Sequence, residues 1–209
     1  MTRPILYSFR RCPYAMRARL AIASSGVTVE LREILLRDKA PEFLLASPSA
    51  TVPCLVTDEG ILDESRDIML WALHQNDPEG WLNMPEEASA LIDVIEGPFK
   101  TALDRYKYST RYHDAEKEEE RAQAADHLKS IDVMLEGRKW LFGDTPSMAD
   151  MAILPFVRQF AMTDKTWFDN QPWPNLSAWL ERFLSSDRLA QIMAKYPKWA
   201  AGDDLTVFP

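Results

Sequence analysis

Cys12 is the residue whose type and position best suit it to chemistry. It follows a short apolar run, Ile5–Tyr7, that favours a strand, and it precedes a segment of strong helix formers, Ala15–Ala23. Pro13 suits the first position of a helix, because its missing N–H would be unpaired there anyway. The sequence therefore predicts Cys12 at a helix N-cap. Unpaired backbone N–H groups and the helix dipole favour the nucleophilic thiolate at such a position.

The charge around Cys12 favours the same form of the sulfur. No acidic residue occurs between Met1 and Val29, whereas the whole chain has a net charge of −8. The same stretch holds five arginines: Arg3, Arg10, Arg11, Arg17 and Arg19. We therefore expect a positive environment for the thiolate. The simpler interpretation, that Cys12 is only a small residue at a tight turn, stays open, although cysteine is not a preferred N-cap residue.

Composition limits the classes of protein to which the chain can belong. Its 209 residues are enough for two small domains, and 46% hydrophobic with 27% charged residues is ordinary for a globular protein. The acidic balance argues against nucleic-acid binding, which needs clustered Lys and Arg. No apolar run approaches the roughly 20 residues of a membrane span, and the N-terminus lacks a signal-peptide pattern. We expect a cytoplasmic protein with no membrane or nucleic-acid partner.

The cysteines and histidines indicate neither a disulfide framework nor a metal site. Only Cys12 and Cys54 occur, so a stabilising disulfide is not expected and a reducing compartment fits better. The histidines are scattered and match no metal-ligand spacing: His74, His113 and His127. The sequence therefore predicts no metal.

The first 76 residues read as an α/β domain. Strands are expected at 5–7, 27–36, 52–57 and 61–62, the last two as a hairpin, and the helix between the first two makes a βαβ unit. A short helix is expected at 40–46, and Ser65 is expected to cap a further helix. The polar segment 77–86 is the expected linker.

Residues 87–209 are expected to form an all-helical domain. Helices are predicted at 86–96, 99–112, 115–135, 173–184 and 188–194, with Gly97-Pro98 as a bend or break between the first two. Ser147 and Asp150 make a capping box ahead of an apolar run, which predicts a buried helix with a structural role.

Four markers in this order resemble the glutathione transferase superfamily, and in particular its cysteine-type (omega-like or bacterial) members. They are Cys12-Pro13 after the first strand, Val52-Pro53 before the third, Glu64-Ser65 at the third helix, and Ser147-Met-Ala-Asp150 in the helical half. The resemblance covers nearly the whole chain. It implies a thioredoxin-like α/β N-terminal domain followed by an all-α C-terminal domain.

The resemblance also implies a glutathione site. Pro53 would be the family's cis-proline, and Val52 would pair its backbone with the cysteinyl segment of glutathione. Glu64 and Ser65 would hold the γ-glutamyl end of glutathione: Ser65 would bind its carboxylate at the helix N-terminus, and Glu64 would accept from its ammonium group. Lys39 resembles a lysine that binds the glycyl carboxylate, although the local match needs a one-residue shift and a solvated surface lysine is an equal alternative.

Cysteine at the catalytic position implies thiol transfer, because conjugating members of the family use Tyr or Ser there. Cys12 would be the catalytic residue, forming a mixed disulfide with glutathione as co-substrate, in deglutathionylation or dehydroascorbate reduction. Ala15 stands where dithiol glutaredoxins have a second cysteine, so glutathione must resolve the intermediate. Cys54 is either a resolving thiol or, as strand alternation favours, a core residue. Tyr7 is not expected to replace Cys12.

Two other functions stay open. One is a conjugating transferase or isomerase acting on a small-molecule electrophile, and the other is a non-enzymatic binding or regulatory protein. A membrane-inserting relative is not expected, because a long apolar segment is missing. The resemblance implies a homodimer, with a monomer as the alternative. Aromatic residues that could wall the electrophile pocket, or simply pack in the core, are Tyr106, Tyr108, Tyr112, Trp167 and Phe168, with Arg111 beside them.

Overall fold

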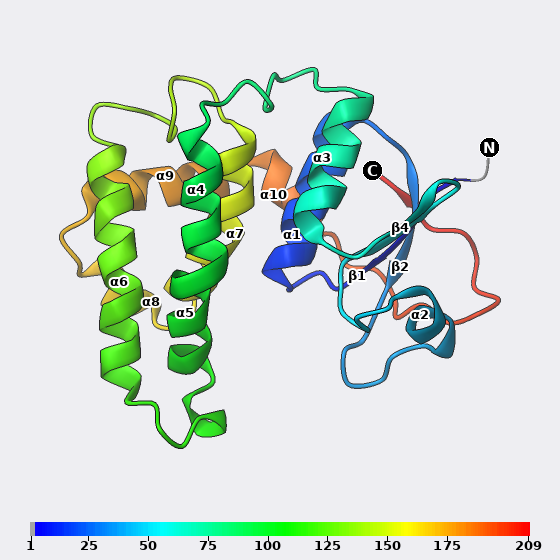
Figure 1. Cartoon of the computed structure of the whole chain (residues 1–209), viewed down its shortest axis with the longest axis horizontal. Helices are drawn as coiled ribbons and strands as arrows, with labels where there is room; N and C mark the ends of the chain where they lie inside the picture. The colour runs from blue at the N-terminus through cyan, green and yellow to red at the C-terminus, as the bar shows by residue number, and fades with distance from the viewer. Residues whose placement is uncertain (1–2) are drawn as a thin grey trace. The chain divides into compact units, whose positions relative to one another are not determined.

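The structure, a computed structural model, describes residues 3–209 and divides into two units (Figure 1). Unit 1 comprises Met1–Leu82 together with Ser186–Pro209, and unit 2 comprises Asn83–Ser185. No helix within the described residues has both the length and the apolar character that a bilayer crossing requires.

Unit 1 is built on a five-stranded mixed sheet in the order β4-β3-β1-β2-β5. Strand β1 (Ile5–Ser8) pairs in parallel with β2 (Val29–Glu33) and antiparallel with β3 (Cys54–Thr57), which forms a hairpin with β4 (Gly60–Leu62). Helix α1 (Pro13–Ser25) connects the two parallel strands, as a parallel pair requires, so the predicted βαβ unit is confirmed.

Two helices of unit 1 pack side by side along the sheet (Figure 1), α1 and α3 (Ser65–Gln75). The apolar residues that α1 buries include Leu20 and Ile22, and α3 buries Ile68 and Met69. Burial of such aliphatic side chains supplies about 1.5–3 kcal/mol each, which is the main force holding these helices together. The short helix α2 (Pro41–Ala46) lies in the connection from β2 to β3.

The C-terminal segment belongs to unit 1, so the prediction that residues 186–209 continue the helical domain was wrong. Strand β5 (Val207–Phe208) pairs antiparallel with β2, and α10 (Asp187–Ile192) packs on α1. The backbone N–H of Trp199 also donates to the carbonyl of Glu33, at 2.9 Å. A two-residue strand is too short to produce a periodic sequence pattern, and its partner lies far away in the chain.

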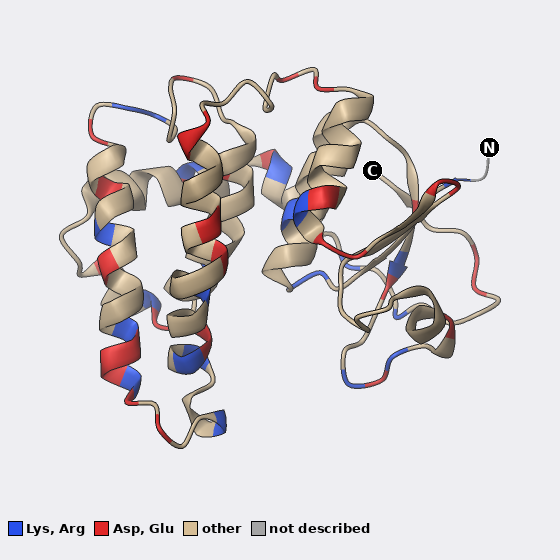
Figure 2. Ribbon diagram, viewed as in Figure 1, with Lys and Arg blue, Asp and Glu red and all other residues tan. Residues whose placement is uncertain are grey.

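Unit 2 is helical, as predicted. Its helices, in chain order, are α4 (Glu87–Val94), the π-helix η1 (Ile95–Phe99), α5 (Lys100–Lys107), the 3₁₀ turn η2 (Ser109–Arg111), α6 (Lys117–Met134), α7 (Met148–Ala161), α8 (Lys165–Asp169) and α9 (Pro174–Leu184). Basic and acidic residues alternate along α6 (Figure 2), as on a solvated helix face. The sequence did not predict α8.

Gly97-Pro98 does not end the helix, so the predicted alternative of a break is wrong. The backbone stays helical from α4 into α5, and Pro98 lies within η1, where one wider turn replaces the regular α-helical turn. A π-helical turn shifts the hydrogen-bonding register, so a proline without an N–H can be accommodated inside a continuous helix.

The predicted capping box at α7 is confirmed. The side chain of Asp150 accepts from the backbone N–H of Ser147 at 2.8 Å and, on its other oxygen, from Leu141 N–H at 2.9 Å and Trp179 Nε1 at 3.0 Å. Asp150 is fully buried, and burial raises its pKa above the ordinary value, although these hydrogen bonds oppose the shift. The capped helix is therefore a buried structural element of unit 2.

Candidate functional site

Cys12 occupies the N-cap of α1, as predicted. Its backbone is extended, its carbonyl accepts from Met16 N–H at 2.8 Å, and Pro13 takes the first helical position. The first turn of α1 contains no acidic residue. The partly buried side chain therefore stands beside the first N–H groups of α1, at the positive end of the helix dipole.

The sulfur of Cys12 meets a segment from far along the chain. Its thiol donates to the backbone carbonyl of Val52, with 3.6 Å between Sγ and the oxygen. The Val52–Pro53 peptide bond is cis, as the resemblance implied. Val52 is itself largely buried, at 7% exposure, and β3 begins just after Pro53. The structure thus brings together three of the predicted site residues at the junction of two loops.

Two contacts act in opposite directions on the ionisation of Cys12. The N-terminus of α1 favours the thiolate. The Val52 carbonyl can only accept a hydrogen bond, so it favours the protonated sulfur. Any group that took over the hydrogen-bonding capacity of this carbonyl would therefore remove this influence toward the protonated sulfur.

The arginines near Cys12 serve several separate contacts, which the sequence did not show. The guanidinium of Arg10 donates to the carbonyl of Met193 at 3.2 Å, and that of Arg11 lies over the ring of Phe9, 5.5 Å from its centroid. Arg19 is fully buried and pairs with Glu33. The contacts of Arg10 and Arg19 thus hold the C-terminal segment and β2 of unit 1 in place, and the expected positive environment for the sulfur stays a prediction.

Glu64 and Ser65 lie at the start of α3, one position from where the sequence placed the cap. Glu64 is the N-cap and is exposed, whereas Ser65 is the first helical residue and is only 2% exposed. The hydroxyl oxygen of Ser65 accepts two hydrogen bonds from Arg17, from Nε at 3.0 Å and Nη2 at 2.8 Å. Ser65 is therefore tied directly to α1, the helix that carries Cys12.

Arg17 is a residue of this site that sequence reasoning missed. In the sequence Arg17 is one of several positive charges, yet in the structure its side chain is only 1% exposed. A signal was present: Arg17 lies within a run of small and apolar residues on a helix that needs to bury most of its surface, and a charged residue there must have partners.

Lys39 lies in the loop before α2 and is partly exposed. Its neighbour Asp38 pairs with Lys198 of the C-terminal segment. The role implied for Lys39 stays a prediction.

Cys54 packs in the core of unit 1, as strand alternation favoured. It is fully buried, its sulfur contacts the carbonyl of Ala46 at 3.8 Å, and neither cysteine is in a disulfide. Burial raises the pKa of the Cys54 thiol to about 11. A thiol that is buried and protonated at neutral pH is poorly suited to resolve a mixed disulfide.

Tyr7 is also a core residue. It is 3% exposed, and its hydroxyl oxygen accepts from Nη1 of Arg32 at 2.7 Å. Burial raises the pKa of its phenol above the ordinary value, although Arg32 opposes the shift. These properties agree with the expectation that Tyr7 does not take the place of Cys12.

Several aromatic candidates for the electrophile pocket prove to be packing residues of unit 2. Tyr106 and Phe168 are buried, and each ring lies against Phe160, with centroids 5.6 and 6.4 Å apart. Trp167 contacts the same ring at 5.9 Å. Tyr108 is less buried, and the guanidinium of Arg111 lies over its ring, 4.4 Å from the ring centroid. The core interpretation therefore holds for Tyr106 and Phe168.

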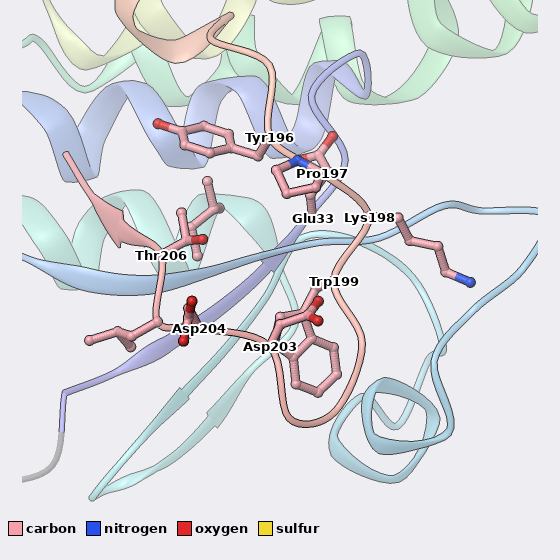
Figure 3. A pocket seen from close by; sticks show the side chains of 10 residues that line it. Glu33, Tyr196, Pro197, Lys198, Trp199, Asp203, Asp204 and Thr206 are labelled. Atoms are coloured by element: carbon pink, nitrogen blue, oxygen red, sulfur yellow. The ribbon is translucent and has the colours of Figure 1, made fainter.

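A cavity of about 390 Å³ opens beside the C-terminal segment (Figure 3). Its lining comes from Leu31 and Glu33 of β2 and from residues 196–199 and 203–206, and it includes none of the predicted site residues. The carboxylate of Glu33 is already engaged, by Arg19 and by the backbone N–H of Arg10 at 2.7 Å. This cavity is therefore not formed by the residues of the predicted site.

Comparison with known proteins identifies the fold and the family. The family model for the glutathione S-transferase N-terminal domain matches residues 6–80, and the model for the C-terminal domain matches residues 114–182. Glutathione S-transferase U22 of Arabidopsis thaliana is 26% identical over 90% of this chain and 88% of its own. The maleylacetoacetate isomerase of Pseudomonas aeruginosa is 26% identical over 92% of both chains.

A solved structure agrees with these sequence matches. It is a glutathione transferase family member from Pseudomonas fluorescens with two glutathione bound, which superimposes with a TM-score of 0.76 at 18% identity. The superposition covers 91% of this chain and 92% of the other. The mixed sheet with its packed helices is thus a thioredoxin-like domain, and the helical part corresponds to the family's C-terminal domain. On these grounds the chain belongs to the glutathione S-transferase superfamily.

Proposed function

We propose that this protein is a glutathione-dependent thiol transferase that works through a mixed disulfide on Cys12. The observation that carries the proposal is the position of the Cys12 sulfur at a helix N-terminus, 3.6 Å from the carbonyl of Val52 and next to the cis Val52–Pro53 peptide. A nucleophilic sulfur and a backbone edge able to pair with a peptide thus lie side by side. This is the arrangement needed to bring the sulfur of glutathione to that of Cys12.

Glutathione fits the remaining predicted residues by charge. The tripeptide carries a carboxylate at each end and an ammonium group at its γ-glutamyl end. In the proposal, Val52 pairs with its cysteinyl backbone, and the N–H and hydroxyl of Ser65 at the start of α3 hold the γ-glutamyl carboxylate. Exposed Glu64 accepts from the ammonium group, and Lys39 pairs with the glycyl carboxylate. The two glutathione molecules in the Pseudomonas fluorescens relative support this choice of co-substrate.

The reaction follows from thiol–disulfide exchange. The Cys12 thiolate attacks the glutathionyl sulfur of a glutathionylated substrate, the S–S bond breaks, and the substrate leaves as a thiolate that takes up a proton. A second glutathione, as its thiolate, attacks the glutathionyl sulfur bound to Cys12. This step releases glutathione disulfide and restores the Cys12 thiolate. Each turnover consumes one glutathione thiol and releases one substrate thiol, and the disulfide bond passes from the substrate to glutathione disulfide. The reaction therefore needs a compartment rich in reduced glutathione, such as the cytoplasm.

A second candidate function is conjugation or isomerisation of a small-molecule electrophile. The similarity to a maleylacetoacetate isomerase and to glutathione S-transferase U22 favours it. In that case Cys12 would stabilise the glutathione thiolate instead of forming a bond to it. A non-enzymatic binding role is less well supported, because such a protein would not need a cysteine sulfur at a helix N-terminus in contact with the Val52 carbonyl. Homodimer formation stays a prediction.

Mass spectrometry of the intact protein tests the proposal. The wild type, Cys12→Ala and Cys54→Ala are each treated with glutathione disulfide at neutral pH. We expect the wild type and Cys54→Ala to gain one glutathionyl group that dithiothreitol removes, and Cys12→Ala to gain none. Modification of Cys12→Ala, or no modification of the wild type, would contradict the proposal. Reduction of a glutathionylated peptide, compared with conjugation of an aromatic halide, then decides between the two functions.

A further inference from the structure

Helix α1 reaches the proposed glutathione site at two points. Cys12 lies at its N-cap, and Arg17, within the helix, contacts the first residue of α3. Arg17 is 1% exposed and Ser65 is 2% exposed, so both groups are removed from water. Hydrogen bonds to a charged donor in such surroundings are stronger and more directional than those at a surface.

The hydrogen bonds from Arg17 decide what the Ser65 hydroxyl can do. A serine hydroxyl has one hydrogen to donate and two lone pairs with which to accept. Arg17 donates to this oxygen twice, from Nε at 3.0 Å and from Nη2 at 2.8 Å, so both lone pairs are used. Within the described part of the chain, these are the hydrogen bonds that the Ser65 hydroxyl makes. Its hydrogen therefore remains available for a further acceptor.

We propose that Arg17 is a positioning residue that fixes the Ser65 hydroxyl as a hydrogen-bond donor to the γ-glutamyl carboxylate of glutathione. The inference rests on the proposed function, in which Ser65 receives that carboxylate. Arg17 acts through Ser65 in two ways. It occupies the accepting side of the hydroxyl, and its permanent positive charge polarises the O–H bond.

The chemistry of arginine suits this role better than that of lysine. The guanidinium is planar and presents two donors in a fixed fork, so it holds one oxygen in place and cannot lose its charge. A lysine ammonium would offer rotating donors and would need water that this buried position does not provide. The same fork ties α3 to α1, which keeps Ser65 at a constant place relative to Cys12.

The test compares two ligands by titration calorimetry. One is glutathione, and the other is an analogue, 4-aminobutanoyl-cysteinylglycine, in which hydrogen replaces the γ-glutamyl carboxylate. The wild type is expected to bind glutathione about tenfold more tightly than the analogue, the size of effect expected from a charge-assisted hydrogen bond. Arg17→Met is expected to lose most of this preference by weakening only the binding of glutathione, and Arg17→Lys to keep part of it.

Arg19→Met is the matched control, because it also removes a buried arginine from α1. Arg19 contacts Ser8 and Glu33 and not Ser65. We expect it to leave the ratio of the two affinities unchanged, whatever it does to stability. In the thiol transfer reaction, Arg17→Met should raise KM for glutathione and leave kcat at saturation unchanged, since Cys12 is untouched. A purely structural role for Arg17 would not raise KM for glutathione while leaving kcat unchanged.

The outcomes distinguish the inference from the function on which it rests. If the wild type binds both ligands equally, or if Arg17→Met keeps the preference for glutathione, the role of Arg17 is wrong while glutathione binding stands. If the wild type binds neither ligand, the proposed function fails and the inference fails with it. Should Arg17→Met not fold, Arg17→Lys decides the question: a reduced preference for glutathione supports the role of Arg17, and a full preference overturns it.

Discussion

The thiol of Cys12 and the backbone carbonyl of Val52 are in contact, with 3.6 Å between sulfur and oxygen, although 40 positions separate them in the chain. The contact joins the N-terminus of α1 to the loop that enters β3 through a cis-proline. One side of this junction is a nucleophile and the other is a backbone edge, so a bound peptide would be held where its thiol meets Cys12.

Cys12→Ser should abolish thiol transfer and retain glutathione binding. A serine hydroxyl has nearly the size of the thiol and can hydrogen-bond to a glutathione thiolate, but it is not ionised at neutral pH and does not attack a disulfide. We expect reduction of a glutathionylated peptide to fall to the uncatalysed rate. Conjugation of an aromatic halide should persist or increase. Thiol transfer that survives in Cys12→Ser would show that another group is the nucleophile.

Cys54 should resist alkylation in the native protein. Burial raises the pKa of its thiol from 9.0 to about 11, so at pH 8 only about one molecule in a thousand carries the thiolate. Iodoacetamide should modify one thiol of the native wild type and none in native Cys12→Ala, with Cys54 reacting only after denaturant is added. Because the folded pKa is the higher one, the contribution of Cys54 to stability is present below pH 9 and lost as pH rises through 11. Rapid labelling of native Cys12→Ala would contradict the buried position.

The parts of this structure that the sequence predicted correctly depend on neighbouring residues. Cys12-Pro13 at a helix start and Ser147 with Asp150 in a capping box are local arrangements, and both are present. The partners of the arginines cannot be predicted in this way, because a long side chain can reach any group within several ångströms. The sequence gives the sign of a charge near Cys12 but not whether Arg10 turns to Met193 or Arg17 to Ser65.

The same reasoning explains the errors in the fold. Strand β5 exists because β2 offers an open edge, and its two residues contain no pattern of their own. Pro98 normally signals the end of a helix, but a single π-turn accommodates it at a cost that only the surrounding packing can offset. Both features are decided by tertiary contacts, which a reading of local pattern does not include.

Tyr7→Phe should leave thiol transfer unchanged and lower stability. The phenol is buried, its oxygen accepts from Arg32 at 2.7 Å, and burial raises its pKa, so it is protonated at neutral pH. Removing the oxygen takes one acceptor from Arg32, which retains Glu30 as a partner, and should cost about 1 kcal/mol of the free energy of unfolding. Urea denaturation measures this loss. If Tyr7→Phe abolished the glutathione-dependent activity while remaining folded, the assignment of catalysis to Cys12 would be wrong.

Asp150→Ala should destabilise the protein strongly without a specific effect at Cys12. The change removes the acceptor of four donors in a fully buried place: the backbone N–H groups of Leu141 and Ser147, the hydroxyl of Ser147 and the indole N–H of Trp179. Leaving such groups unpaired costs about 1–3 kcal/mol each, so we expect a loss of at least 3 kcal/mol in the free energy of unfolding. Asp144→Ala, at an exposed aspartate in the loop before α7, is the matched control and should change stability little.

The pH dependence of stability is a second, independent test of the buried position of Asp150. Burial raises its folded pKa above 3.8, so its protonated form favours the folded state. That contribution is complete below the unfolded pKa and is lost as pH rises through the folded pKa. The asparagine of Asp150→Asn does not titrate. The free energy of unfolding of this variant, measured by urea denaturation, should therefore fall further below that of the wild type at pH 3.5 than at pH 7. A deficit that instead shrinks on acidification would mean that the hydrogen bonds to the carboxylate outweigh its burial, and that its folded pKa is lowered.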